Sequence, residues 1–469
     1  MQLTRRDLIR GGLAAGSLLA LGGPAGRVAA ADLPSLRPLG APRVGPWLAL
    51  AGSLHDHSTD SDGDSSSEAV TTWLHAHRQE LGIDFMTLSD HSDFFPASYN
   101  VGVMPDPWSR QGALMQQYTG ADFSLLRGFE WTNDQQNHLN VVLSQQWTTR
   151  FITGDAWLSM RPFWEWFSLP AGVGGADGLG QFNHPGDKGA LNWDDYALDL
   201  AAAQRMCTIE VHGAQGRDGR GSSDAGWYWF ALAKGWHVSP VMNWDWHNWS
   251  SDAILQDPTP GSDYGVAGHL PGQRSVVFAA DARPASLRSA LLARRTTATE
   301  TPDLWAMLSG RRHGHGRPGP RVWQGGEITG VGDGEAQLRV DFGSPTEAVT
   351  RIDIVGDNGV SPYPYYYGDN ADWSANHSQL TLSYLAQHDR YVTSGGQATR
   401  KDRIDTPPPG TVLATLPVDP TRSYVETTIR LPAAASPRPD GKHFVYAIAY
   451  AGDAANPARC WTAPLLLAG

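Results

Sequence analysis

Residues 48–63 read LALAGSLHDHSTDSDG. The apolar first half, Leu48 to Leu54, predicts a buried strand, and His55 and His57 follow directly at its end. Side chains alternate along an extended backbone, so the two imidazoles project to the same side and can bind one metal ion. Asp62 adds a carboxylate just before a glycine, where we expect the chain to turn. This stretch predicts the first part of a multi-metal hydrolase site.

A helix and a second strand follow this stretch. Ser65 and Glu68 have capping-box spacing, the next apolar residues recur at helical intervals, and Gly82 is a plausible stop. Residues 83–88 form an apolar run that ends just before His91. Strand–helix–strand order is typical of a parallel sheet, whose active sites lie at the carboxyl ends of the strands.

The same pattern continues to about residue 300. Further strands are predicted at 123–129, 138–143, 178–183, 205–211, 236–242 and 274–279, and a helix at 284–295. Some seven strands in roughly 250 residues fit a β/α barrel. Imidazoles and carboxylates recur at the strand ends: Glu130, His138, His184, Glu210, Asp245 and His247.

The character of the chain changes after Glu300. Short alternating strands at 337–340, 351–355, 424–431 and 444–450, separated by turn residues, predict a β-sandwich. The expected fold class is therefore α/β, a distorted seven-stranded β/α barrel followed by a small C-terminal β-sandwich. The expected divisions are a signal peptide at 1–31, a lead-in at 32–50, the barrel at 51–305, a linker at 306–321 and the sandwich at 322–469.

The N-terminus predicts export. Residues 4–10, TRRDLIR, resemble a twin-arginine signal, and an apolar Gly/Ala-rich run and small residues follow, with cleavage expected near Ala30 or Ala31. The apolar run is too short to span a bilayer stably. The mature protein is expected in the periplasm, the cell envelope or the extracellular medium.

The composition limits the partners. The 469 residues carry a formal net charge of -12, which argues against nucleic acid or an anionic membrane bound through a broad basic surface. A small-molecule ester is the expected substrate, and the oligomeric state is left open. The two cysteines, Cys207 and Cys460, are far apart, and Cys207 lies in a predicted strand, which favours a core thiol.

Nine residues form the candidate metal set: His55, His57, Asp62, His91, Glu130, His138, His184, Asp245 and His247. Mixed nitrogen and oxygen ligands suit Zn, Mn or Fe. One bridging carboxylate can hold two ions about 3.5–4 Å apart. We therefore expect two or three divalent ions of open identity.

The order of these motifs resembles the polymerase-and-histidinol-phosphatase (PHP) superfamily of metallohydrolases. The segments GSLHDHSTDSDG, LSDHSD, GFEWT and HLNVV are most similar to its branch of exported and carbaryl-hydrolase-like enzymes. The resemblance covers residues 51–300 and implies a distorted seven-stranded barrel with two or three metals. It departs at NWDWHN, where larger residues flank the last motif.

The resemblance also implies how the ligands divide. His55, His57 and Asp245 would bind a first metal, which Glu130 would bridge to a second. His138 and His184 would complete the second. Asp62, His91 and His247 would bind the third.

Several residues are candidates for catalysis or substrate binding. A metal-acidified water would attack phosphorus or a carbonyl, with Asp62 or Asp245 steadying it. His247, His212 or His237 could protonate the leaving group. We expect Trp244, Trp246 and Trp249 to line the cleft. Arg217 could bind an anionic group of the substrate. Glu210 could orient a metal ligand without binding the ion itself. For Arg217, His212 and His237 an ordinary structural role is an open alternative.

Three functions are compatible with these residues. The first is a secreted metal-dependent phosphoesterase acting on a mono- or diester. The alternative is a metal-dependent carbamate, ester or amide hydrolase, and the third is a non-catalytic protein that binds a glycan or the cell envelope.

Overall fold

The structure is a computed structural model that describes residues 42–95, 106–133, 136–151, 153, 160–185, 192–211, 224–252, 254–256, 272–313, 318–331, 335–344, 346–357, 359, 391–394, 397–400, 410–432 and 434–469. The predicted signal peptide lies outside these residues. Within them, no helix is long and apolar enough to cross a membrane.

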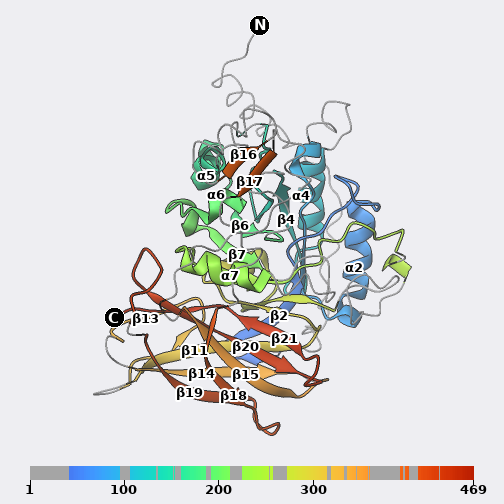
Figure 1. The fold of residues 1–469 in the computed structure, drawn as a ribbon. Coiled ribbons are helices and arrows are strands. Elements are labelled where there is room, and N and C mark those ends of the chain that lie inside the picture. The colour runs from blue at the N-terminus through green and yellow to red at the C-terminus, as the bar shows by residue number, and fades with distance from the viewer. Residues whose placement is uncertain are drawn as a thin grey trace.

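A run of strands forms the frame of the helix-bearing body (Figure 1). Its strands are β1 (Arg43–Val44), β2 (Trp47–Ser53), β3 (Phe85–Leu88), β4 (Ser124–Trp131), β5 (Leu139–Val142), β6 (Leu179–Phe182), β7 (Met206–Glu210), β8 (Ser239–Val241), β9 (Arg274–Ala279) and β10 (Thr296–Thr299). Hydrogen bonds link β9, β2, β3, β4, β5, β6, β7 and β8 in that order. The mixed α/β architecture is therefore present.

Seven strands, β2 to β8, are neighbours in this order, and the segment after the last strand contacts the segment after the first. Asp56, just after β2, forms an isolated parallel bridge with Trp246, just after β8. Among the described residues, β8 and β2 do not pair with each other as strands, so a closed barrel stays a prediction. The contact brings the two ends of the strand series together beside the predicted ligands.

One part of the sheet corrects the expectation of parallel strands. β5 pairs antiparallel with both β4 and β6. The connection from β4 to β5 is residues 132–138, which is too short for the crossover that parallel neighbours require. The reversal matters for the site, because the first residue of β5 lies at the same sheet edge as the end of β4.

Helices cover the strands of this body: α2 (Ser67–Leu81), α4 (Pro107–Gln117), α5 (Arg161–Ser168), α6 (Asn192–Tyr196), α7 (Asp224–Ala233) and α8 (Pro284–Leu292), with short 3₁₀ turns η1 (Ser92–Phe94), η2 (Ala171–Val173), η3 (Ala202–Gln204) and η4 (Ile254–Gln256). The N-cap of α2 is Ser66, which accepts from Ala69 N, so the predicted capping box at Ser65 is one residue early. Gly82 ends α2 as expected, in a left-handed conformation that glycine adopts without strain.

Most of the C-terminal strands form a second body below the first (Figure 1). They are β11 (Trp305–His313), β12 (Val322–Trp323), β13 (Glu327–Ile328), β14 (Glu335–Gly343), β15 (Val349–Gly356), β18 (Thr411–Pro417), β19 (Tyr424–Arg430), β20 (His443–Ala451), β21 (Ala458–Thr462) and β22 (Leu465–Leu467). The remaining two strands, β16 (Tyr391–Ser394) and β17 (Gln397–Arg400), pair with each other and are drawn with the first body in Figure 1. One four-stranded sheet has the order β12-β11-β14-β19. Its buried residues share an apolar core with those of β15, β20 and β22, as two packed sheets require.

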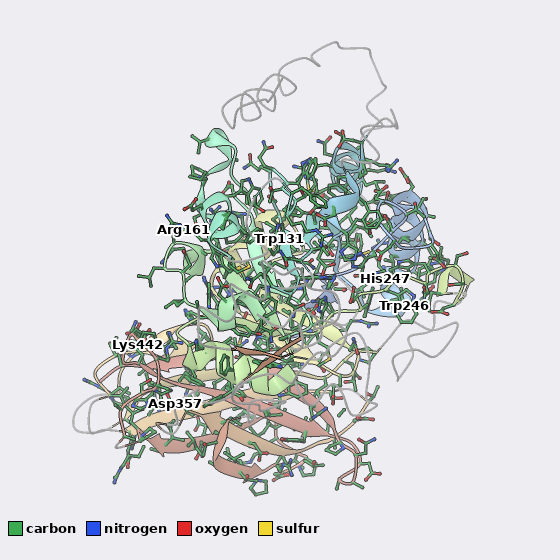
Figure 2. All side chains as sticks on the ribbon, turned by 45° about the horizontal axis from the view of Figure 1, so that its top comes forward. Trp131, Arg161, Trp246, His247, Asp357 and Lys442 are labelled. Carbon is green, nitrogen blue, oxygen red and sulfur yellow. The ribbon has the colours of Figure 1, made fainter. Side chains whose placement is uncertain are left out.

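The two bodies share a sheet. β10 pairs with β9 on one side and with β21 on the other, so the large sheet continues from one body into the next. Trp131, Trp246 and His247 lie in the helix-bearing body, and Asp357 and Lys442 lie in the other (Figure 2). The division into domains stays a prediction, but much of the predicted linker at 306–321 is strand β11. Residues 306–310 of β11 are buried, and the sequence did not indicate this strand because a Gly- and Arg-rich segment follows it.

Candidate metal centre

The nine predicted ligands lie at one edge of the sheet. His55 and His57 follow β2, His91 follows β3, and Glu130 is the second-last residue of β4. His184 follows β6, and Asp245 and His247 follow β8. His138 precedes β5, whose antiparallel direction places that start beside the other strand ends. All nine residues belong to groups whose ligand atoms lie within 4.8 Å of one another.

The backbone around His55 and His57 is fixed from the side of β8. Asp245 N donates to His55 O at 2.8 Å, and His57 N donates to Trp246 O at 3.1 Å. These bonds extend the Asp56–Trp246 bridge and bring Asp245 beside the two histidines. The first and last segments of the site in the sequence are therefore held together by main-chain hydrogen bonds.

The predicted first-metal set has distances that suit one ion. His55 Nε2 lies 3.2 Å from His57 Nε2, 3.1 Å from Asp245 Oδ1 and 3.2 Å from Glu130 Oε1. His57 Nε2 lies 3.0 Å from Asp245 Oδ1 and 3.5 Å from Glu130 Oε2. Ligands about 2.0–2.1 Å from a tetrahedral ion are about 3.3–3.4 Å apart, so the spacing of His55, His57 and Asp245 suits three ligands of one such ion.

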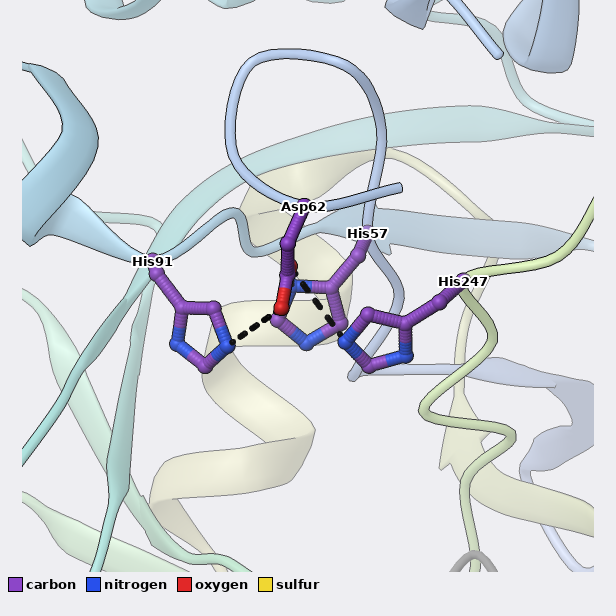
Figure 3. A group of neighbouring side chains, drawn as sticks. All are labelled: His57, Asp62, His91 and His247. Carbon is purple, nitrogen blue, oxygen red and sulfur yellow. Dashed lines mark ion pairs between the residues drawn. The ribbon is translucent and has the colours of Figure 1, made fainter. Parts of the chain in front are cut away.

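A second group is more open to solvent. The imidazoles of His57, His91 and His247 surround the carboxylate of Asp62 (Figure 3). Asp62 Oδ2 lies 3.5 Å from His91 Nε2, and Oδ1 lies 3.4 Å from His247 Nε2. The side chains of Asp62 and His247 are 43% and 30% exposed, whereas those of His55 and Glu130 are buried. A substrate can therefore approach the centre at this group.

The remaining ligands only partly follow the predicted division. His138 Nδ1 and His184 Nε2 lie 3.1 and 3.4 Å from Glu130 Oε1, as a shared ion would require. However, His138 groups with His91 and Glu130, whereas His184 groups with His55 and Asp245. The four groups overlap, and the structure does not separate three independent ligand sets.

Two further observations favour a functional role for this centre. Among the described residues, His184 Nδ1 is a buried nitrogen without a hydrogen-bond partner. His184 and Asp245 also have positive φ angles of 28° and 51°, which side-chain-bearing residues rarely adopt. Strained backbone of this kind is concentrated at functional sites.

The charges of the site depend on one another. Burial by itself would lower the pKa of His55. The carboxylates of Asp245, Glu130 and Glu210 together outweigh this effect, so the pKa of His55 lies well above its usual value. Burial alone would raise the pKa of Glu130, and the surrounding histidines hold it well below its usual range. The carboxylates are therefore ionised at neutral pH, and they attract protons or metal ions into the same space.

His57 and His91 differ in charge although they are neighbours. Burial, together with His91 and His247, lowers the pKa of His57 to about 3. Burial also opposes charge on His91, but Glu130 and Asp62 raise its pKa to about 10. A divalent ion bound here would replace the proton on His91, so loading should release protons.

Glu210 supports the ligands from behind, as its strand-end position suggested. Its Oε1 accepts from His55 Nδ1 at 3.0 Å and from Asn243 Nδ2 at 2.8 Å. Its Oε2 accepts from the backbone N of His184 at 2.5 Å. The bond to His55 Nδ1 fixes the tautomer that leaves Nε2 directed at the centre.

Sequence reasoning missed a layer of buried amides beneath the ligands. Asn183 Nδ2 donates to Glu130 Oε1 at 2.8 Å and to Asn140 Oδ1 at 2.9 Å. Gln181 Nε2 donates to Asn183 Oδ1 at 2.9 Å. These residues fix the orientation of Glu130. The sequence did contain one indication of this layer: amide side chains occur in or next to strands that are otherwise apolar.

Other predicted contacts are not supported. Trp244 and Trp246 are 0% and 3% exposed and, like Trp249, pack in a core cluster with residues of α2, so they do not line an open cleft. Indole rings have large apolar surfaces, and this core buries them. His212 and Arg217 lie outside the described residues.

His237 is also placed unfavourably for catalysis. It precedes β8, whereas the ligands follow β8, so it lies at the opposite end of that strand. Burial and nearby arginines lower its pKa to about 3.

An aromatic side chain lies beside the open group. Phe94 of η1 is 45% exposed, and its ring lies 6.2 Å from that of His91 at an interplanar angle of 29°. Asp93, its neighbour, pairs with Arg150 Nε at 3.0 Å. The described rim of the centre thus offers an apolar surface next to a neutralised ion pair.

The fold and the site define a mixed α/β protein with a histidine- and carboxylate-rich candidate metal centre. No protein-family model matches the sequence, and no curated protein matches it. Among solved structures, the chain is similar to the crystal structure of a two-domain protein from Bacteroides vulgatus that contains a predicted PHP-like metal-dependent phosphoesterase. The identity is 14%, the match covers 87% of this chain and 92% of that chain, and the TM-score is 0.39. A likeness at this level identifies neither the activity nor the substrate of this chain.

Proposed function

We propose that the protein is a metal-dependent hydrolase that cleaves phosphoesters. The observation that carries the proposal is the mutual spacing of 3.0–3.2 Å among His55 Nε2, His57 Nε2 and Asp245 Oδ1, within a nine-residue ligand cluster. Six imidazoles and three carboxylates form this cluster, a donor set that suits Zn, Mn or Fe.

The charge of the centre favours an anionic substrate when three ions are bound. The three ligand carboxylates and the adjoining Glu210 contribute -4, so the balance is +4 - 4 = 0 with two divalent ions and +6 - 4 = +2 with three. The positive balance is local, despite the net charge of -12 of the whole chain. A phosphate mono- or diester therefore matches the centre electrostatically.

Bound divalent ions would supply an activated water and polarise the phosphoryl group. The buried residues His55, His57 and Glu130 hold the centre in shape. Asp62 and His247 are its solvent-facing members, so they lie nearest to an arriving ester. His247 Nδ1 donates to the carbonyl oxygen of Asp245 at 2.9 Å, which fixes its ring with Nε2 facing Asp62.

A second candidate is hydrolysis of a neutral carbamate, ester or amide. Phe94 presents an apolar surface beside His91, and the guanidinium of Arg150 is already paired with Asp93. The described rim therefore suits an apolar group as well as an anion.

The wider assignments belong to this proposal. We infer that the chain is a member of the PHP superfamily, related to its exported branch, and that its helix-bearing body is a barrel. We also infer export by the twin-arginine route, on the basis of residues 4–10, and a small-molecule ester as substrate. Binding of nucleic acid is not expected for an acidic chain.

A substrate panel tests the reaction class. Metal-loaded protein should hydrolyse p-nitrophenyl phosphate or its bis-ester faster than an aryl carbamate, and alanine at His55 or glutamine at Glu130 should abolish the activity. Faster cleavage of the carbamate would favour the second candidate. If the metal-loaded wild type cleaves none of these esters and the two variants do not differ from it, the proposal of a hydrolase is rejected.

A further inference from the structure

The open ligand group depends on two loops that come from opposite ends of the strand series. Asp62 lies in the loop after β2, and His247 lies in the loop after β8. Their side chains meet, with Asp62 Oδ1 3.4 Å from His247 Nε2. Because both side chains are partly exposed, packing alone constrains them less than it constrains the buried ligands.

A carboxylate outside the ligand set joins these two loops. Asp64 Oδ1 accepts from Ser250 N at 2.8 Å, and Asp64 Oδ2 accepts from Ser251 N at 2.7 Å. The backbone N of Asp64 donates to His247 O at 2.9 Å. Asp64 thus makes three hydrogen bonds to the five residues that begin with His247.

Asp64 itself is not placed as a ligand. It belongs to none of the four ligand groups, and both of its carboxylate oxygens accept from backbone amides. Trp249 Nε1 donates to His57 O at 2.8 Å and anchors the buried side of the same loop. Asp64 holds the exposed side, which bears Ser250 and Ser251.

We propose that Asp64 is a positioning residue that clamps the Asp62 loop to the His247 loop and thereby completes the open group of the metal centre. The inference rests on the proposed metal centre and deepens it. The clamp acts through the backbone on both sides, so it sets the distance between two ligands without contacting an ion. Partners of this kind typically change metal affinity 10- to 100-fold when they are removed.

The chain provides a matched control. Asp199 Oδ1 also accepts from two backbone amides, those of Ala201 and Ala202 at 2.9 and 2.8 Å. It precedes β7, at the end of that strand opposite the ligands. Asp199→Ala therefore removes the same kind of interaction without touching the centre.

Divalent metal bound per chain, measured by elemental analysis across a series of buffered free-metal concentrations, tests the clamp. In Asp64→Ala one class of ion should require about 10-fold more free metal for half-occupancy, whereas Asp199→Ala should match the wild type. Asp64→Asn should lie between the wild type and Asp64→Ala, because one amide oxygen can still accept. Identical metal curves for Asp64→Ala and the wild type would overturn the clamp.

Hydrogen exchange of the metal-free proteins provides a readout independent of loading. The peptide spanning 247–252 should exchange faster in Asp64→Ala than in the wild type, with thermal unfolding shifted no more than in Asp199→Ala. Unchanged exchange would overturn the clamp and leave the metal centre intact. A wild-type protein that binds no divalent ion would reject the metal centre itself, and the role of Asp64 with it.

Discussion

Replacing Glu210 by glutamine should weaken metal binding as well as the fold. All the hydrogen-bond partners of Glu210 named above are donors: His55 Nδ1, Asn243 Nδ2 and the backbone N of His184. A glutamine amide presents an NH₂ group to at least one of them. One buried donor is then left unsatisfied, at a cost of about 1–3 kcal/mol.

The effect on the metal follows from the same contacts. If His55 loses its acceptor, its ring is no longer fixed with Nε2 towards the centre. Outer partners of metal-binding histidines change affinity about 10- to 100-fold, which corresponds to about 1.4–2.8 kcal/mol. We expect a loss in that range for Glu210→Gln, measured by competition with a chelator of known affinity.

Glu300 provides the control for this variant. It is also buried, and it accepts from the backbone N of Arg459 at 2.7 Å and from its guanidinium, away from the ligands. Glu300→Gln should lower stability in thermal unfolding without changing metal affinity. Wild-type metal affinity in Glu210→Gln, or an equal loss in Glu300→Gln, would refute the reasoning about Glu210.

Three further changes have defined outcomes. Gly63→Ala should lower activity and metal content, because a Cβ there would lie 2.8 Å from the backbone of Ser58 and displace the loop that carries Asp62; unchanged metal content would contradict this. Burial, with a contribution from Asp122, raises the pKa of Asp84 from 3.8 to about 7, so the native state keeps a proton that the unfolded chain loses. Unfolding free energy should therefore fall by up to about 4 kcal/mol as pH rises from about 4 to 7, and Asp84→Asn should remove that slope. Phe94→Ala should raise KM for an aryl phosphate about fivefold and leave methyl phosphate unaffected, with the distant Leu200→Ala as control, because the exposed part of the ring contributes about 1 kcal/mol when a substrate covers it.

Much of the site could be anticipated because its residues repeat one local pattern. Most of the apolar strands in the helix-bearing body end next to an imidazole or carboxylate, and strand ends of one sheet meet at an edge. The structure brings all nine residues together there. That they bind metal ions stays a prediction, which the geometry of His55, His57 and Asp245 supports.

What the sequence concealed depends on contacts between distant segments. The direction of β5 reverses because its connection is short, and this places His138 at the ligand edge. The tryptophans after β8 pack under α2, a partner about 180 residues earlier in the chain. Asn183 and Asp64 act through hydrogen bonds to other loops and strands, for which no local sequence pattern exists.

The architecture of the C-terminal part shows the same limit. Alternating apolar and polar residues at 337–340 predict a strand with one buried face, and burial alternates along β14 in the structure. The pairing of β10 with β21, which makes one sheet continuous between the two bodies, joins residues about 160 positions apart. Such a pairing is set by the complete fold, so composition gave no indication of it.

The measurement that tests the central claim most directly is anomalous diffraction from crystals of the protein soaked with Mn or Zn. We predict an ion within about 2.0–2.2 Å of His55 Nε2, His57 Nε2 and Asp245, with at least one more ion beside Glu130 or Asp62. Anomalous signal absent from this edge of the sheet in metal-soaked crystals would contradict the account.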